Sequence, residues 1–330
     1  MLSVVIPVYN ESESLEELHR QLTEVAAAEN YELDLIFVDD GSRDGSWDLI
    51  RCLAHRDCHV RGVRFRRNFG KAGALSAGFA LARGDMVMTL DADLQDDPHE
   101  IPRFLAKIGK DLDVVSGWKK VRHDPWHKVL PSRAFNWMVS RLTGVRLHDH
   151  NCGMKCYRRE VLSEVRLYGE LHRFVPVLAA ARGFRVGELE INHRARQFGH
   201  SKYGLTRFVK GFLDLLTVKF LTGFGQRPQH ALGTAGLTLF AIGAAWLIFL
   251  AAWWGISRLG IFNMEVMHLK ERPAGVLYSA ASLLLGAQFM SMGFLAELFI
   301  AYHDPDVKAY SIAERTPSSD DRAASSRAGK

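Results

Sequence analysis

The chain has 330 residues, of which 48% are hydrophobic and 24% are charged. These values are typical of a folded protein with a large core, and they exclude a disordered tail protein, a collagen and a disulfide-rich miniprotein. The net charge of +5 is concentrated in residues 194–227, which carry seven basic side chains and one acidic one. Such a stretch before an apolar segment predicts attraction to phosphates or anionic lipid headgroups. We expect no nucleic-acid partner, because that would need aromatic residues interleaved with a wider basic face.

Strands and helices alternate through the first part of the chain. Short apolar runs predict strands at 3–7, 33–38, 60–65, 86–90 and 114–116. Three- and four-residue spacing of apolar side chains predicts helices at 12–28, 47–53, 72–81 and 98–108. This alternation is typical of a mostly parallel α/β sheet with helices on both faces. Ligands bind such sheets beyond the carboxyl ends of the strands, and the unusual polar clusters of this chain follow its strands there.

The next part of the chain has a mixed pattern. Residues 132–142 have helical spacing, and 154–157 and 186–191 resemble strands. Residues 203–224 are amphipathic, with Leu205, Phe208, Val209, Phe212 and Leu216 on one side. Two interpretations of this helix stay open: it lies in a membrane interface, or it packs on the globular domain as an ordinary surface helix.

Two long apolar segments follow. Residues 231–257 are 27 residues without a formal charge, and residues 274–296 are 23 more. The first would form a helix about 40 Å long, which exceeds the ~30 Å hydrocarbon core of a bilayer. The pattern therefore predicts two membrane helices.

The flanks of these segments are less informative. The loop 258–273 gives only a weak orientation signal, and residues 303–330 have the composition of a disordered tail. Glu297 lies near the end of the second apolar helix, where it could reach the headgroups; a functional carboxylate within the membrane is the alternative.

The cysteine pattern indicates a reducing compartment. Cys52, Cys58, Cys152 and Cys156 form no Cys-x-x-Cys pair, so we expect reduced thiols. Metal binding by Cys152 and Cys156 lacks an obvious second pair of ligands. The N-terminal segment has no basic region and leads directly into a strand pattern, so we expect no signal peptide.

The strongest chemical signal is the acidic segment after the fourth predicted strand. Asp91 and Asp93 follow that strand, and in an extended segment residues i and i+2 point the same way. Gln95 adds a neutral oxygen to the two carboxylates. Hard cations such as Mg²⁺ prefer oxygen ligands of this kind and keep positions open for substrate phosphates. The alternative is an acidic strand-to-helix turn in which Asp97 caps the helix that Pro98 opens.

Two further clusters follow the first and second predicted strands. Asp40, in the segment 39–44, could accept hydrogen bonds from a base or from ribose hydroxyls; a helix cap is the alternative. In the segment that begins at Pro7, Tyr9 could flank a nucleobase and Glu11 could bond to it.

The segments 5–11, 39–42 and 91–96, followed by two C-terminal apolar helices, resemble family 2 glycosyltransferases. More narrowly, the chain resembles the polyprenyl-phosphate sugar transferases, the group similar to dolichol-phosphate mannosyltransferase. The segments 67–71, 149–155 and 196–203 also resemble that group. Each motif alone is modest, but their order and spacing over nearly all of residues 1–302 are specific.

The resemblance implies an α/β GT-A fold: a cytosolic domain with a Rossmann-like, mostly parallel sheet, then an amphipathic interface helix and two transmembrane helices. The expected boundaries are 1–202 for the GT-A domain, 203–230 for the juxtamembrane helices, 231–257 and 274–302 for the spans, 258–273 for the loop between them and 303–330 for a cytosolic tail. The implied location is the inner (cytoplasmic) membrane. Assembly into homo-oligomers through the membrane helices stays open.

The resemblance also implies roles for individual residues. Nucleotide-sugar binding would involve Pro7, Tyr9, Glu11, Val38, Asp40, Asp91, Ala92, Asp93, Lys119, Arg196 and Lys202. The ligands of a divalent cation, Mg²⁺ or Mn²⁺, would be Asp91, Asp93 and Gln95, and the catalytic residues would be Asp91, Asp93 and Asp149. The family often has an arginine after the fifth strand, where this chain has Lys119 and Lys120, and a lysine lacks the bidentate fork of arginine.

The implied activity is inverting transfer of a sugar from a UDP- or GDP-linked donor to polyprenyl (undecaprenyl or dolichyl) phosphate. A phosphate monoester has a second pKa of about 6, so the acceptor is largely dianionic at neutral pH and needs no strong general base. We therefore expect His148 and His150 to be structural polar groups. Arg133 or Arg141 would lie near the lipid phosphate. The pattern does not select among UDP-glucose, GDP-mannose and a UDP-aminoarabinose derivative as donor.

Two other classes of protein share part of this pattern. A processive polysaccharide synthase of the same family usually carries a Gln-x-x-Arg-Trp motif, which neither Gln197 nor Gln226 begins. A non-catalytic nucleotide-binding membrane scaffold would not need the complete set of acidic and basic residues named above.

Overall fold

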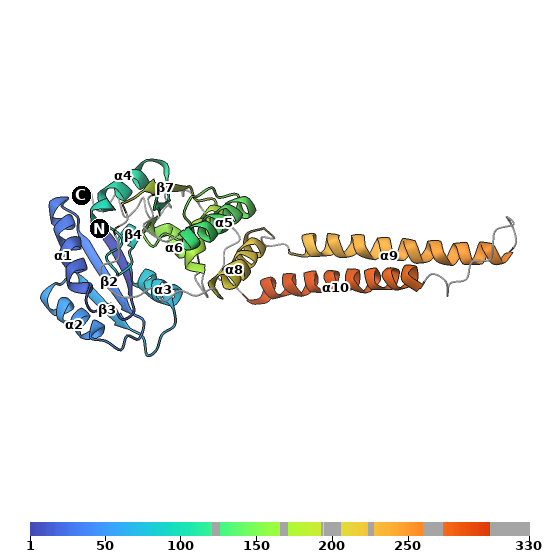
Figure 1. The fold of residues 1–330 in the computed structure, drawn as a ribbon, viewed down its shortest axis with the longest axis horizontal. Helices are drawn as coiled ribbons and strands as arrows, with labels where there is room; N and C mark the ends of the chain where they lie inside the picture. Colours follow the sequence, from blue (N-terminus) through green and yellow to red (C-terminus); the bar gives the residue numbers. More distant parts are fainter. Residues whose placement is uncertain are drawn as a thin grey trace, which may run out of the picture. The chain divides into compact units, whose positions relative to one another are not determined.

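The computed structural model describes residues 1–120, 126–165, 171–192, 194, 206–223, 228–259 and 273–303. The chain divides into two compact units, a larger one over Met1–Thr222 and a smaller one over Gly223–Ala309 (Figure 1). The expectations for Arg196, for Lys202, for most of the loop 258–273 and for the C-terminal tail fall outside the described residues.

The larger unit is built on a seven-stranded sheet with the order β3-β2-β1-β4-β6-β5-β7. Its strands are β1 (Leu2–Val8), β2 (Leu33–Asp39), β3 (Val60–Arg64), β4 (Met86–Thr89), β5 (Val114–Trp118), β6 (Lys155–Arg158) and β7 (Val186–Glu190). Among the strands that the described residues form, only β6 runs antiparallel to its neighbours, β4 and β5. The mostly parallel sheet expected from the sequence is confirmed, and the ends of the seven predicted strands differ from the observed ones by no more than two residues.

Helices alternate with the strands as predicted in the first part of the chain. The larger unit contains α1 (Leu15–Ala28), α2 (Ser46–Arg56), α3 (Lys71–Leu81), the 3-10 helix η1 (Pro98–Glu100), α4 (Ile101–Asp111), α5 (Trp126–Thr143), α6 (Arg159–Glu164), the 3-10 helix η2 (Leu171–Phe174), α7 (Val175–Ala181) and α8 (Thr206–Gly223). The sequence did not predict α6, η2 and α7, because segments of one or two turns are too short to show a helical period.

The strand period of two explains how the sheet is covered. Along β1, Val4 and Ile6 face a cluster that includes Leu18 of α1, whereas Val5 faces the opposite cluster with Leu75 of α3. The first cluster also takes in α2 and α4. Full burial of each of these side chains contributes about 1.5–3 kcal/mol, so both sheet faces stabilise the unit.

The amphipathic helix α8 has two different faces. Leu215 and Val218 are fully buried in a cluster with Phe135 of α5 and Phe174 of η2. Phe212, Leu213 and Leu216 remain exposed. The helix therefore packs on the globular unit through one face, and contact of its exposed face with a membrane interface stays a prediction.

The smaller unit consists of α9 (Pro228–Leu259) and α10 (Pro273–His303), both long and apolar enough to cross a membrane (Figure 1). The two helices approach closely at Gly236 and Gly243 of α9. A Cβ added to Gly236 would lie 2.6 Å from the carbonyl oxygen of Gly286, and one added to Gly243 would lie 2.7 Å from that of Ser279. Small residues of this kind are typical of packed membrane helices.

Glu297 of α10 has a local role in this helix pair. Its Oε2 accepts a hydrogen bond of 3.2 Å from the Gln229 N–H, in the first turn of α9. The first N–H groups of a helix have no intrahelical partner and are stabilised by a carboxylate. The side chain that sequence reasoning placed near headgroups therefore satisfies the start of the neighbouring helix.

Candidate functional site

The polar clusters after β1, β2 and β4 meet at one edge of the sheet, because these three strands are parallel neighbours. The loops after β1 and β2 are joined directly. The Asn10 N–H donates to Ser42 Oγ at 2.9 Å, and the Glu11 N–H donates to Ser46 Oγ at 3.0 Å. The three loops therefore share one edge of the sheet, although they are far apart in sequence. They contain the predicted site residues Pro7, Tyr9, Glu11, Asp40 and Asp91.

Asp40 organises the loop before α3. Its Oδ1 accepts the Phe69 N–H at 2.6 Å and its Oδ2 accepts the Gly70 N–H at 2.9 Å. Burial raises the pKa of Asp40, while these two backbone donors act in the opposite direction. The next residue, Gly41, has a φ of 73° and packs so closely that a Cβ would lie 2.7 Å from the Arg67 carbonyl carbon. Asp40 thus positions the segment 67–70, and a nucleotide contact by its carboxylate would have to share oxygens already bonded there.

Two other predicted binding residues have buried side chains. Val38 is fully buried in the cluster under α3, and Ala92 is buried in the cluster on the opposite face. Either residue can therefore offer a ligand only its backbone groups.

Asp91 begins the loop of residues 91–97 between β4 and η1, which we call the acidic loop. Its carboxylate has neighbours on two sides. The Lys71 ammonium, from the first residue of α3, bonds to Asp91 Oδ1. On the other side lies Gly153, where a Cβ would be only 2.5 Å from Asp91 Oδ2. Although desolvation opposes ionisation of this one-third exposed carboxylate, the positive charge and hydrogen bond of Lys71 lower the pKa of Asp91 to about 2. Asp91 is therefore a carboxylate with a cationic partner.

The acidic loop is not the extended segment that the sequence analysis expected. Residues 92–94 form a turn, and Leu94 has a φ of 60°, in the left-handed region. The turn is stabilised by the Asp93 side chain, whose Oδ1 accepts the Gln95 N–H at 3.2 Å. Aspartate commonly bonds to the backbone two residues on, and this local bond replaces the alternation of an extended strand. Asp93 itself is buried.

Lys119 lies in a buried ion pair at the far end of the same loop. Its Nζ is 2.9 Å from Asp96 Oδ1, and the two side chains are 16% and 0% exposed. Burial acts against the charge, but Asp96 raises the pKa of Lys119 above its ordinary value. The neighbouring Lys120 pairs with Glu190 at the surface, at 3.1 Å. In this structure the Lys119 ammonium therefore pairs with Asp96 of the acidic loop. The contact of Lys119 with the nucleotide, expected from the family resemblance, stays a prediction.

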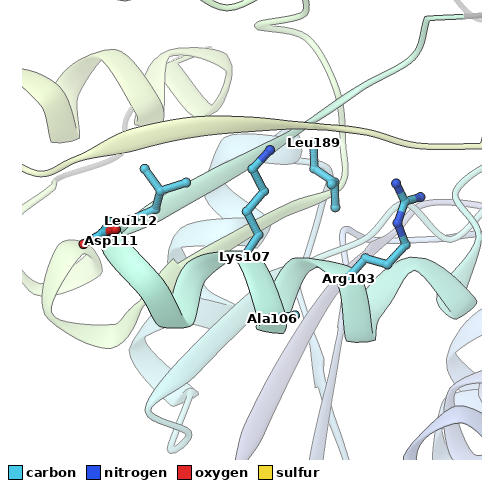
Figure 2. A pocket seen from close by; sticks show the side chains of 6 residues that line it. All are labelled: Arg103, Ala106, Lys107, Asp111, Leu112 and Leu189. Atoms are coloured by element: carbon cyan, nitrogen blue, oxygen red, sulfur yellow. The ribbon is translucent and has the colours of Figure 1, made fainter.

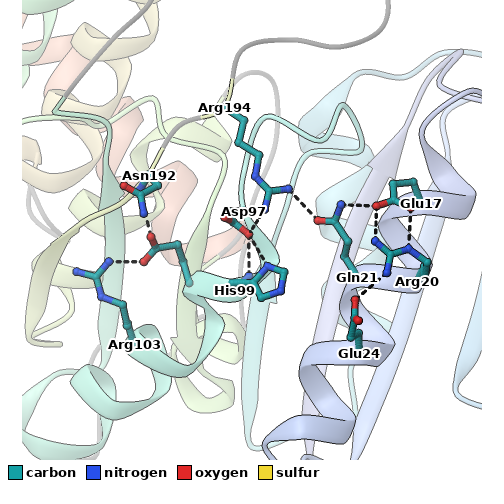
Figure 3. Close-up of polar contacts among 10 residues, drawn as sticks. Glu17, Arg20, Gln21, Glu24, Asp97, His99, Arg103, Asn192 and Arg194 are labelled. Atoms are coloured by element: carbon teal, nitrogen blue, oxygen red, sulfur yellow. Dashed lines mark hydrogen bonds and ion pairs between the residues drawn. The ribbon is translucent and has the colours of Figure 1, made fainter.

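Arg194 ties the acidic loop to the rest of the unit (Figure 3). Its N–H donates to Gln95 O at 3.0 Å, and its Nη2 lies 2.7 Å from Asp97 Oδ1. Its Nη1 donates to Gln21 Oε1 of α1 at 2.9 Å. Asp97 also accepts the His99 N–H at 3.0 Å, so the predicted cap at the helix start is confirmed.

Asp149 lies in the segment between α5 and β6. It is buried, its Oδ1 accepts the Asn151 N–H at 3.0 Å, and its own N–H donates to Glu188 Oε1 at 3.0 Å. The buried Lys155 ammonium donates to the Cys152 carbonyl. Burial lowers the pKa of Lys155, and the charges of Asp149 and Asp91 act in the opposite direction.

The two predicted structural histidines are held by neighbours. His148 stacks on Trp118 with 4.2 Å between ring centroids, and its Nδ1 lies 2.7 Å from Glu188 Oε2. His150 is fully buried, with its Nε2 3.1 Å from Ser140 Oγ. Burial lowers the pKa of His150 to about 4, so it is neutral at physiological pH.

Sequence reasoning gave no role to Lys71, Lys155 and His172, whose charges interact with that of Asp91, or to Arg173, whose charge acts on His172. Lys71 and Lys155 lie in the segments 67–71 and 149–155, which resemble the family. That resemblance was the sequence feature that could have identified them as candidate site residues. His172 and Arg173 lie in the short helix η2, which has no periodic pattern. The pKa of His172 falls well below its ordinary value, through burial and then through the positive charges of Lys71 and Arg173.

Other polar features lie apart from this edge. An open cleft between α4 and β7 is lined by none of the residues above; its lining residues are Arg103, Ala106, Lys107, Asp111, Leu112 and Leu189 (Figure 2). Asp57, Cys58 and His59 bring possible ligand atoms within 4.8 Å of one another on the loop before β3.

The four cysteines are free thiols. Burial raises the pKa of Cys152 and of Cys156 to about 12, so both thiols are protonated at neutral pH. This agrees with the expectation of reduced cysteines.

Comparison with known proteins agrees with these features. The model of the family described as "Glycosyl transferase family 2" matches residues 3–166. The dodecaprenyl-phosphate galacturonate synthase of Rhizobium johnstonii is 36% identical over 302 residues, covering 90% of this chain and 87% of that protein. The undecaprenyl-phosphate 4-deoxy-4-formamido-L-arabinose transferase of Pseudomonas fluorescens is 37% identical over 315 residues, covering 93% and 86%.

A solved structure shows the same fold. Glucosyl-3-phosphoglycerate synthase from Mycobacterium tuberculosis, in complex with Mn²⁺, uridine diphosphate and phosphoglyceric acid, matches with a TM-score of 0.53 and 18% identity, covering 67% of this chain and 78% of that chain. The chain therefore belongs to glycosyl transferase family 2: it is a glycosyltransferase with a GT-A fold, and it groups with the polyprenyl-phosphate sugar transferases.

Proposed function

We propose that this enzyme transfers a sugar from a nucleotide-diphosphate sugar to a polyprenyl phosphate at a membrane surface. The names of its relatives support the acceptor, since one is a dodecaprenyl-phosphate synthase and the other an undecaprenyl-phosphate transferase. The observation that carries the proposal is the meeting of the β1, β2 and β4 ends, where the Asp91 carboxylate lies beside a cationic partner.

The acidic loop suits a divalent cation. Asp91, Asp93 and Gln95 offer two carboxylates and an amide oxygen, the ligand types that Mg²⁺ and Mn²⁺ prefer. The Lys71 ammonium at Asp91 indicates that positive charge is favourable at this carboxylate. We assign these three residues to a Mg²⁺ or Mn²⁺ ion, which when bound would neutralise part of the charge on the diphosphate.

The transfer is a single displacement. An oxygen of the acceptor phosphate attacks the anomeric carbon, and the bond from that carbon to the diphosphate oxygen breaks, with its electron pair leaving on the nucleoside diphosphate. The configuration inverts. No proton has to be removed, because a phosphate monoester has a second pKa of about 6. Negative charge grows on the leaving group, and fixed positive charges lower the free energy of that transition state.

The other binding roles follow from position. Tyr9 and Glu11 are proposed to contact the nucleoside and Asp149 to position the acceptor. Arg196 and Lys202 are proposed to contact the diphosphate, on the resemblance alone.

The proposed membrane arrangement has α9 and α10 as the two spans and α8 at the interface, with residues 1–202 in the cytosol. The exposed Phe212, Leu213 and Leu216 of α8 support contact with lipid. On α5, the side chain of Trp137 is exposed between Arg133 and Arg141, a combination typical of a headgroup region. In this proposal the acceptor is a lipid phosphate of the inner membrane.

A donor screen tests the function. The full-length enzyme in detergent is incubated with undecaprenyl phosphate, Mg²⁺ or Mn²⁺, and labelled UDP- and GDP-sugars. Label in the organic extract supports the proposal and names the sugar. Label in polymer would favour a processive synthase, and nucleotide binding without transfer of any sugar would favour a scaffold.

A further inference from the structure

Lys71 lies where a mobile counter-ion could act. It is the first residue of α3, directly after Gly70, which has a φ of 89° and whose N–H is held by Asp40. This turn directs the lysine to the carboxyl edge of β4, where its ammonium bonds to Asp91. The side chains of Lys71 and Asp91 are 31% and 34% exposed, so the contact is open to exchange with solvent ions.

The Asp91 carboxylate has little room to turn away from Lys71. Gly153 packs against its other oxygen, and an added Cβ there would lie 2.5 Å from Oδ2. A divalent cation that bound Asp91 would therefore come close to the ammonium, and the two positive charges would repel each other. Lys71 and the cation compete for one carboxylate.

We infer that Lys71 is a built-in counter-ion that occupies Asp91 in the unloaded enzyme and is displaced when the cation and the nucleotide bind together. The inference rests on the proposed function in one respect, the assignment of Asp91 as a cation ligand. A nucleoside diphosphate supplies the negative charge that can receive the displaced ammonium. Cation and nucleotide binding are then coupled through Lys71, and each ligand raises the affinity of the enzyme for the other by the same factor.

The test measures Mn²⁺ binding to the full-length enzyme in detergent, by electron paramagnetic resonance of free Mn²⁺, with and without UDP. The Lys71→Met variant removes the competing charge. Without UDP it should bind Mn²⁺ about tenfold more tightly than the wild type, a change in the usual range of coupling between sites. With UDP this advantage should shrink or reverse, because the receiving ammonium is also lost.

Two further variants serve as controls. Lys71→Arg keeps the charge and should bind Mn²⁺ like the wild type in the absence of UDP. Arg51→Met makes the same change in net charge at an exposed surface pair with Asp48, and should leave Mn²⁺ binding unchanged. A thermal unfolding curve for each variant confirms that the protein is folded.

The outcomes separate this inference from the proposed function. If Lys71→Met binds Mn²⁺ no more tightly than the wild type without UDP, while Asp93→Asn loses Mn²⁺ binding, the counter-ion role is wrong and the cation site stands. If Asp91→Asn binds Mn²⁺ as the wild type does, the assignment of Asp91 as a cation ligand is wrong, and the inference is lost with it.

Discussion

Two lysine–aspartate pairs lie at opposite ends of the acidic loop, and they differ in their access to water. In the pair Lys71–Asp91, which we call the open pair, both side chains are about one-third exposed; in Lys119–Asp96, the sealed pair, they are 16% and 0% exposed. A solvent-exposed ion pair contributes little to stability and can exchange partners, whereas breaking a buried pair leaves an uncompensated charge. One end of the loop is therefore suited to ligand exchange and the other to holding the loop in place.

The sealed pair should give the largest effect on stability. In Lys119→Met, the Asp96 carboxylate stays buried without its cation, so we expect a loss of about 3–5 kcal/mol in the free energy of unfolding. The denaturant midpoint of the full-length protein in detergent measures this loss. A change below about 1 kcal/mol would show that the two pairs do not differ as their burial indicates.

His150 extends the comparison of buried and open groups to pH, because its side chain is fully buried and neutral. Its pKa is about 4 in the folded protein and 6.5 ordinarily, so below pH 6.5 the unfolded chain binds a proton that the folded one does not. Stability is complete above that pH and should fall by about 3 kcal/mol as the pH drops to 4.

The measurement compares unfolding of the wild type and His150→Gln at pH 7.5 and pH 4. The variant should lose less stability on acidification than the wild type. Equal losses of stability in the two proteins would show that the protonation of His150 does not cause the loss.

Gly153 tests whether the position of Asp91 matters to the open pair. The Cβ of Gly153→Ala would lie 2.5 Å from Asp91 Oδ2, so the carboxylate or the backbone has to move. We expect a stability loss of about 1–3 kcal/mol, as for other overpacked sites, together with a fall in sugar transfer larger than the loss of folded protein. Gly109→Ala is a matched control, since its added Cβ meets no atom within 4 Å. Equal transfer rates in the two variants would contradict the tight fit at Asp91.

The smallest effect on stability is expected from the open pair itself. Lys71→Met should change the free energy of unfolding by less than about 1 kcal/mol, because solvent screens an exposed pair. The same denaturant experiment measures it. If Lys71→Met lost as much unfolding free energy as Lys119→Met, both pairs would stabilise the fold equally, and the contrast between an open and a sealed pair would be wrong.

Much of the fold could be predicted from local patterns. The strands and the longer helices follow from hydrophobic period, and the two apolar helices follow from length and lack of charge. The antiparallel direction of β6 could not be predicted, because strand direction depends on which neighbours a strand meets in space.

The site was predictable in its location and less so in its contacts. Strand ends placed Asp91, Asp93 and Asp40 at one edge, as general rules for parallel sheets require. The turn at Leu94 and the pairing of Lys71 with Asp91 depend on side-chain bonds between distant segments, which no local pattern records.

The most direct test of the account is sugar transfer by Asp93→Asn, since the buried Asp93 shapes the acidic loop and is assigned to the cation. With undecaprenyl phosphate, the donor found by the screen and Mg²⁺ or Mn²⁺ present, the folded, membrane-inserted variant should put no label into the organic extract, whereas the wild type does. Near-normal transfer by that variant would contradict the claim that the acidic loop carries the reaction.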